Sequence, residues 1–113
     1  MGELELPGEN AKMPIYQTGA YQVKASAVER VKAAVKEFCD YVEANEPGSQ
    51  MYLAWQQKDD PTKFLHLFIF ADAAARERHG QSAAVEKFKS AYTPELVGGA
   101  VKFTEYEMIA GRR

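Results

Sequence analysis

The chain has 113 residues, of which 46% are hydrophobic and 27% are charged, and its formal net charge is −2. This length fits one domain with its own hydrophobic core, and the composition is that of a soluble globular protein. A net charge so close to zero, without basic clusters, argues against nucleic acid and against an anionic membrane surface as partners. No apolar run is long enough to span a membrane and the N-terminus lacks the pattern of a signal peptide, so we expect a cytoplasmic protein.

The N-terminal part of the chain divides into an extension and a first strand. Residues 1–13 show no hydrophobic periodicity, so we expect a peripheral extension ahead of a single domain over residues 14–110. β-branched and aromatic residues then become frequent in residues 14–24, which predicts a strand. Gly19 in the middle of this strand indicates a bulge or a close approach by another group.

A long amphipathic helix is predicted next. Ser26 and Glu29 have the spacing of a capping box, in which each side chain accepts from the other residue's amide. Apolar residues recur behind the cap at helical spacing, namely Val28, Val31, Val35, Phe38 and Val42. The helix must end before Pro47. Cys39, the only cysteine, cannot form an internal disulfide, and it lies on the apolar side of the helix, which favours a small core residue over a reactive thiol.

The most apolar run of the chain lies at residues 64–72, and its length fits a strand. Its side chains fall into two sets by parity, Leu65, Leu67 and Ile69 on one face and Phe64, His66, Phe68 and Phe70 on the other. Because His66 is the only polar interruption, both faces of this strand must be covered. Residues 49–57 are predicted to form the preceding strand, and residues 58–62 the turn of a hairpin.

A second helical region is predicted after this strand. Asp72 is a candidate N-cap for a helix that falters at His79, and Ser82 restarts the helix. Thr93-Pro94 ends the helix that Ser82 restarts.

The order of the predicted elements defines the fold class. Gly98-Gly99 is expected to be a sharp connection into a last strand over residues 100–109. The order strand, helix, strand, strand, helix, strand predicts an α+β, ferredoxin-like βαββαβ fold, in which both helices cover one face of a four-stranded antiparallel sheet. The open face then carries large apolar side chains that a second copy would bury. We therefore expect a homodimer through the open sheet face, with an apolar pocket for a small molecule where the two sheets meet.

Several short segments also match one family. They are Glu46-Pro47-Gly48, Tyr52, the stretch from Asp60 to Phe64, the stretch from Phe70 to Ala75, His79, Val85 and Phe88. From about Ile15 to Ile109 the chain resembles the antibiotic biosynthesis monooxygenase (ABM) family of dimeric α/β barrels. The resemblance implies a protein that binds or converts a small molecule. Members include cofactor-independent monooxygenases that act on hydroxyaromatic or quinol substrates, haem-degrading enzymes, and proteins that handle small signalling metabolites.

Two departures from the family pattern narrow the range of functions that the resemblance implies. Members commonly carry Glu and Trp at the positions of Phe68 and Phe70, so the pocket here is expected to be more apolar. The haem-degrading branch uses an Asn in the first strand, and residues 15–24 contain none, so we do not expect haem degradation. The two histidines of the chain lack the spacing of metal ligands, and neither a metal nor another cofactor is predicted.

Two histidines are the candidates for proton transfer. His79 matches a family position, and an imidazole with a pKa of about 6.5 suits proton transfer at neutral pH, which makes it the candidate catalytic base. The alternative is a helix-end histidine satisfied by a carbonyl or by water. His66 is a second possible acid or base if its face of the strand lines the pocket, and otherwise a satisfied interface histidine. With His66, the predicted substrate-binding residues are Tyr52, Phe68 and Phe70, because Tyr52 matches a family position and a phenol can stack on a flat ligand and donate to it.

The leading functional hypothesis from the sequence is therefore a cofactor-independent monooxygenase. It would oxidise a small aromatic, quinol or polyketide-like molecule with O₂, with His79 as the proton acceptor. The alternative is a non-catalytic dimer that binds a small apolar metabolite. Isomerase or lyase chemistry on a related barrel, which needs the same single base, is a third reading.

Overall fold

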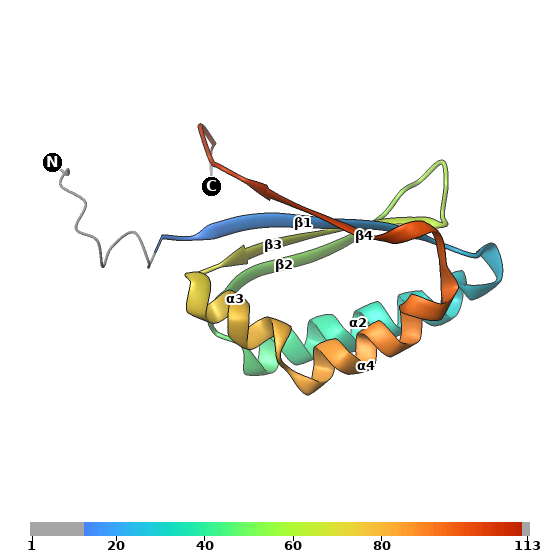
Figure 1. Cartoon of the computed structure of the whole chain (residues 1–113), viewed down its shortest axis with the longest axis horizontal. Coiled ribbons are helices and arrows are strands. Elements are labelled where there is room, and N and C mark those ends of the chain that lie inside the picture. The colour runs from blue at the N-terminus through green and yellow to red at the C-terminus, as the bar shows by residue number, and fades with distance from the viewer. Residues whose placement is uncertain (1–12, 112–113) are drawn as a thin grey trace, which may run out of the picture.

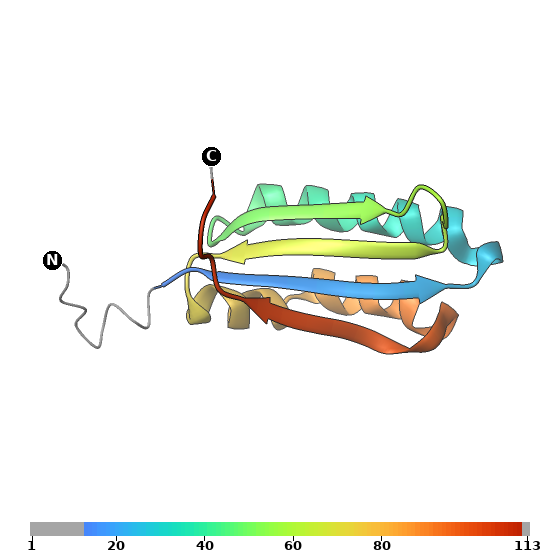
Figure 2. The same ribbon diagram turned by 90° about the horizontal axis from the view of Figure 1, so that it is seen from above.

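Four antiparallel strands form one sheet, and the helices lie against one of its faces (Figure 1). The computed structural model describes residues 13–111. In chain order its elements are β1 (Ile15–Val23), the 3₁₀ turn η1 (Ala25–Ala27), α2 (Val28–Asn45), β2 (Ser49–Gln56), β3 (Lys63–Phe70), α3 (Ala73–Gly80), α4 (Ala83–Tyr92), the 3₁₀ turn η2 (Thr93–Glu95) and β4 (Leu96–Tyr106). The strand order is β2-β3-β1-β4, with β3 and β1 in the centre (Figure 2). This arrangement confirms the predicted ferredoxin-like fold.

The predicted parity of β3 is confirmed, and it decides which side chains form the core. Phe64, His66, Phe68 and Phe70 are buried on the face that the helices cover. The long helix α2 contributes Val31, Val35, Phe38 and Val42 to the core, and α4 contributes Phe88 and Tyr92. Burying each of these side chains contributes about 1.5–3 kcal/mol, so the helix face is the main source of stability.

Among residues 13–111, no helix covers the opposite face of the sheet (Figure 1). Exposed large apolar side chains there come from β2 and β3, with Leu53 40%, Trp55 50% and Leu65 36% exposed. Tyr106 on β4 is 55% exposed and pairs with Tyr16 at the same face of the sheet. The prediction of an apolar open face is therefore confirmed for this subunit.

The predicted helix caps are confirmed in two of three places. The Asp72 carboxylate accepts from the Ala75 amide at 2.8 Å, and the Ser82 hydroxyl accepts from the Val85 amide at 3.1 Å. The predicted capping box at Ser26 is wrong. This residue lies exposed in η1, because the 3₁₀ turn precedes α2, and the helix begins after a cap that makes no side-chain hydrogen bond.

The last strand begins earlier and ends earlier than predicted. Gly98 and Gly99, expected to form a connection, are part of β4, with φ angles of 81° and 111° that strongly favour glycine. The predicted close approach at Gly19 is confirmed, since a Cβ atom there would lie 3.1 Å from the Phe103 ring of β4. A separate register shift between β1 and β4 lies between Ala20 and Gln22, whose partners on β4 are Lys102 and Val97.

Two further predictions concern the ends of the chain and the membrane. Of the predicted extension over residues 1–13, only Met13 lies within the described residues. No helix in the described part of the chain is long and apolar enough to cross a membrane.

A close contact at Gly48 joins the loop before β2 to α3. A Cβ atom at Gly48 would lie 2.8 Å from the Cβ of the buried Ala75, too close for both to stay in place. We expect Gly48→Ala to lower the free energy of unfolding by about 1–3 kcal/mol, measured by urea denaturation. Gly80→Ala is the matched control, because nothing lies within 4 Å of its Cβ position and alanine favours the helix. Equal stability of the two variants would contradict the prediction.

Candidate active site

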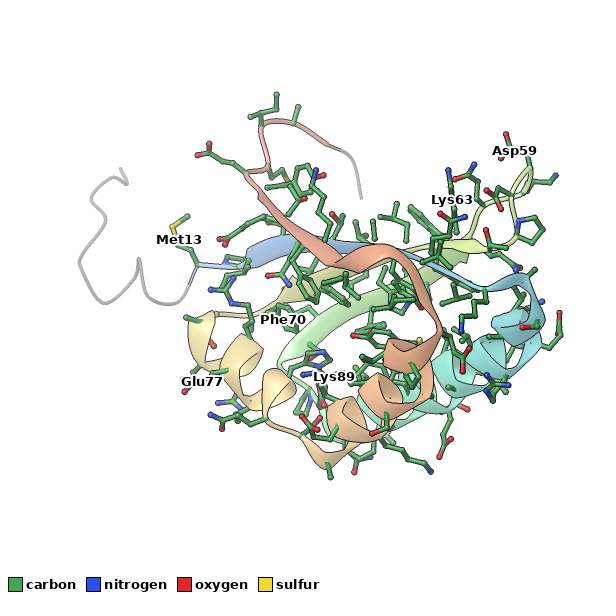
Figure 3. All side chains as sticks on the ribbon, turned by 45° about the vertical axis from the view of Figure 1, so that its right-hand side comes forward. Met13, Asp59, Lys63, Phe70, Glu77 and Lys89 are labelled. Atoms are coloured by element: carbon green, nitrogen blue, oxygen red, sulfur yellow. The ribbon has the colours of Figure 1, made fainter. Side chains whose placement is uncertain are left out.

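A pocket of about 240 Å³ lies between the sheet and the helices. Its lining comes from the three strands β1, β2 and β3, from β4, and from all three helices, and Figure 3 shows the side chains that crowd this space around Phe70. The five residues that the sequence singled out all line it, namely Tyr52, His66, Phe68, Phe70 and His79. The fold therefore brings the predicted site residues together, although they come from three separate elements.

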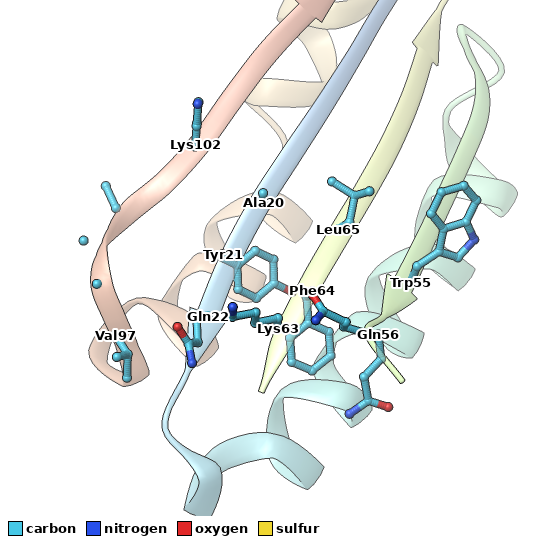
Figure 4. Close-up of a pocket in the computed structure, with 14 residues that line it drawn as sticks. Ala20, Tyr21, Gln22, Trp55, Gln56, Lys63, Phe64, Leu65, Val97 and Lys102 are labelled. Atoms are coloured by element: carbon cyan, nitrogen blue, oxygen red, sulfur yellow. The ribbon is translucent and has the colours of Figure 1, made fainter. Parts of the chain in front are cut away.

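The expected pocket lies where two sheets meet, on the open face. The five predicted residues instead share the parity that faces the helices. A larger hollow of about 610 Å³ does lie on the open face, where Trp55, Leu65 and Lys102 line it (Figure 4). None of the five predicted residues borders that hollow, and its described lining carries no histidine or carboxylate, so the helix-side pocket is the candidate active site.

His79 is held by a carboxylate that the sequence analysis did not assign a role. Its Nδ1 lies 2.8 Å from Oε1 of Glu46, and the two side chains are only 12% and 13% exposed. The Ser49 hydroxyl donates to the same oxygen at 3.0 Å. Because a carboxylate only accepts hydrogen bonds, Nδ1 carries the proton, and the lone pair of a neutral His79 is on Nε2. Nε2 is then the atom at which His79 can take up a proton.

His66 lies between two tyrosine hydroxyls. Its Nε2 is 2.8 Å from the Tyr21 hydroxyl and its Nδ1 is 3.1 Å from the Tyr52 hydroxyl. Burial lowers the pKa of His66 to about 4, so the imidazole is neutral at pH 7. Burial also raises the pKa of Tyr21 and of Tyr52 above the ordinary tyrosine value, so both keep their protons. His66 is therefore a neutral group with satisfied hydrogen bonds, which makes it a poor base.

Aromatic rings form the walls of the pocket. The ring of Phe68 lies 4.8 Å from that of Tyr52, and the ring of Phe70 lies 5.2 Å from that of His79. Phe38 of α2 packs 5.5 Å from His79 on another side. Such a lining suits a flat apolar ligand, with the polar atoms limited to a few positions.

Polar side chains also border this pocket. Nη1 of Arg76 donates to Oε1 of Gln17 at 3.2 Å and to Oε1 of Glu105 at 3.1 Å, and these bonds join α3 to β1 and β4. Lys89 of α4 also lines the pocket.

Two further features concern metal binding and the cysteine. Within residues 13–111 no group of three or more His, Cys, Asp or Glu side chains is placed to hold a metal ion. Cys39 is half-buried against the core, and burial raises the pKa of its thiol, as expected for a packing residue.

Comparison with known proteins identifies the family. The sequence model of the family described as antibiotic biosynthesis monooxygenase matches residues 14–91. The chain belongs to the ABM family. Among curated proteins, no significant match was found.

Solved structures of related fold agree with this assignment. A candidate ABM protein from Bacteroides thetaiotaomicron superposes with a TM-score of 0.81 at 20% identity, covering 88% of this chain and 93% of that one. A candidate ABM protein from Caulobacter crescentus gives 0.80 at 18% identity, with 91% and 96% covered. One from Nitrosomonas europaea gives 0.78 at 18% identity, with 87% and 92% covered. At these identities the likeness establishes the fold alone.

The burial of His66 predicts a pH-dependent stability. Its pKa of about 4 in the folded state lies below the unfolded value of about 6.5, so the unfolded state binds more protons between these two pH values. Stability should therefore fall as the pH decreases through this window, by about 2 kcal/mol between pH 7 and pH 5. Urea denaturation at the two pH values measures this change. His66→Gln, which cannot titrate, should show a smaller change, and an equal change in both proteins would contradict the prediction.

Proposed function

We propose that this ABM protein is a cofactor-independent monooxygenase that oxidises a small aromatic, quinol or polyketide-like molecule with O₂. The observation that carries the proposal is the part-buried His79–Glu46 pair, which leaves Nε2 as a proton acceptor beside an aromatic-lined pocket. His79 is the proposed catalytic base. Tyr52, His66, Phe68 and Phe70 are the proposed substrate-binding residues.

The proposed reaction begins with the loss of a phenolic proton. A hydroxyl of the ligand donates to Nε2 of His79 and passes its proton there. The resulting anion is electron-rich and transfers one electron to O₂. The two radicals combine on carbon to form a peroxide anion, which takes back the proton that His79 accepted. Loss of water then leaves a carbonyl, so that a CH₂ group and O₂ become C=O and H₂O. The negative charge of Glu46 stabilises the imidazolium that forms in the first step.

The alternative function is a non-catalytic dimer that binds a small apolar metabolite. Phe68 and Phe70 favour it, because they give the pocket apolar surface where the family commonly has Glu and Trp. In that case the His79–Glu46 pair would only hold α3 against the loop before β2.

We also propose that two copies pair through the open sheet face. Leu53, Trp55 and Leu65 form an exposed apolar surface on neighbouring strands, and pairing with a second copy buries it. An interface of about 800 Å² per subunit is typical of stable complexes. The pocket between sheet and helices stays within each subunit in this arrangement, so dimer formation and ligand binding can be tested separately.

The role of His79 can be tested by oxygen consumption. With a panel of hydroquinones and anthrone-like phenols, we expect His79→Ala to lower the rate of O₂ uptake by about 10²- to 10⁴-fold, the range for loss of a general base. Glu77→Ala on the exposed side of α3 is the control and should keep the wild-type rate. Ligand binding without turnover in every variant would favour the binding protein, and turnover without O₂ uptake would favour isomerase or lyase chemistry.

The proposed dimer can be tested at the centre of the open face. Leu53→Lys places a charge on this surface, and an unpaired buried charge is costly, so we expect a dimer for the wild type and a monomer for the variant. Sedimentation velocity at micromolar concentration distinguishes the two states. Lys36→Asp on the exposed side of α2 is the control and should remain a dimer. A monomeric wild-type protein with an intact fold would rule out this interface.

A further inference from the structure

Tyr21, His66 and Tyr52 form a hydrogen-bonded network that lines the pocket, and its Tyr21–His66 contact is more deeply buried than its Tyr52–His66 contact. Tyr21 is 9% exposed and His66 is 2% exposed, whereas Tyr52 is half-buried. Both hydroxyls bond the imidazole, at opposite ring nitrogens. Because the imidazole is neutral at pH 7, one ring nitrogen carries a proton and the other a lone pair. The nitrogen that carries the proton decides which partner donates in both hydrogen bonds.

The two tautomers of His66 have different consequences for Tyr21. If Nε2 carries the proton, it donates to the Tyr21 oxygen, and the hydrogen of this buried hydroxyl has no other acceptor among residues 13–111. If Nδ1 carries the proton, Tyr21 donates to Nε2 and His66 donates to the Tyr52 oxygen. An unsatisfied buried donor disfavours the first arrangement by roughly 5- to 150-fold in population. The second arrangement therefore dominates.

We infer that Tyr21, acting through His66, holds Tyr52 as a hydrogen-bond donor to the ligand of the pocket. In this arrangement the Tyr52 oxygen already accepts from His66, so its own hydrogen is free to turn toward the pocket that it lines. The pocket then selects a ligand with an acceptor oxygen, a carbonyl or a phenolate, at this position. Tyr21 and His66 are positioning residues, and this inference rests on the proposed ligand pocket but not on its oxidation chemistry.

The pocket thus offers one donor and one acceptor. Tyr52 donates, and Nε2 of His79 accepts, because Glu46 takes the Nδ1–H of that imidazole. A ligand that carries both an acceptor oxygen and a hydroxyl satisfies both groups. The same donor at Tyr52 also stabilises an oxygen on which negative charge develops.

The tautomer of His66 can be observed directly, because the chain has only two histidines. Long-range ¹H–¹⁵N spectra of ¹⁵N-histidine-labelled protein at pH 7 distinguish protonated from unprotonated ring nitrogens, and His79→Gln leaves His66 as the only signal. We expect His66 to be protonated at Nδ1. In Tyr21→Phe, which keeps the ring stacked on Phe64, we expect the two tautomers to approach equal populations. A wild-type His66 protonated at Nε2 would overturn the inference, even if no variant folds.

Ligand preference provides an independent test. The probes are 1-indanone and indane, which share a ring skeleton and differ by the carbonyl oxygen, with binding measured by NMR titration. We expect wild type to prefer the ketone by roughly 5- to 10-fold, Tyr52→Phe to lose the preference, and Tyr21→Phe to show an intermediate value. An unchanged preference in Tyr52→Phe, or no binding of either probe, would overturn the inference. A different result is a protein that prefers the ketone through Tyr52 and yet consumes no O₂ with any phenol. That result would support the inference about Tyr52 and contradict the proposed oxidation.

Discussion

The structure depends on one strand, β3, whose two faces are both apolar. The helices α2, α3 and α4 cover only one of these faces. The aromatic face, which includes Phe64, Phe68 and Phe70, packs under the helices, and the aliphatic face with Leu65 remains open. The strand therefore contributes to two surfaces at once, a pocket beneath the helices and an exposed apolar face on the other side of the sheet.

The strand register places Gly19 beside the pocket and brings the hydrogen-bond partners of His66 into reach. Gly19 of β1 lies opposite His66 in the sheet, and the absence of a side chain there leaves room for the ring of Phe103 from β4. A buried imidazole without partners would be strongly destabilising, and Tyr21 and Tyr52 from the two neighbouring strands satisfy it. The polar group that interrupts the apolar strand is thus kept neutral and fixed.

The sequence predicted what periodicity and turn chemistry can encode. The order of the elements along the chain, the parity of β3, the cap at Asp72, the restart of the helix at Ser82 and the close approach at Gly19 were all readable from local patterns. The pairing of Glu46 with His79 was not, because 33 residues separate them and no spacing rule connects a loop to a helix end. The face that encloses the predicted site residues was not readable for a related reason. The pattern gave two apolar faces, and only the packing of the helices decides which of them encloses the predicted site residues.

The two histidines show how environment separates groups of the same chemistry. His66 is hydrogen-bonded to a neutral hydroxyl at each ring nitrogen, accepting at one and donating at the other, and burial without a charged partner keeps it from gaining a second proton. His79 has one nitrogen on a carboxylate and the other without a protein partner among the described residues, so gaining a proton there creates an ion pair with Glu46. Pairs of titratable groups in such different surroundings are typical of sites in which one group transfers a proton and the other has a different role. On this argument His79 is the only histidine of the pocket suited to accept a proton, and the value of His66 lies in what it does to Tyr52.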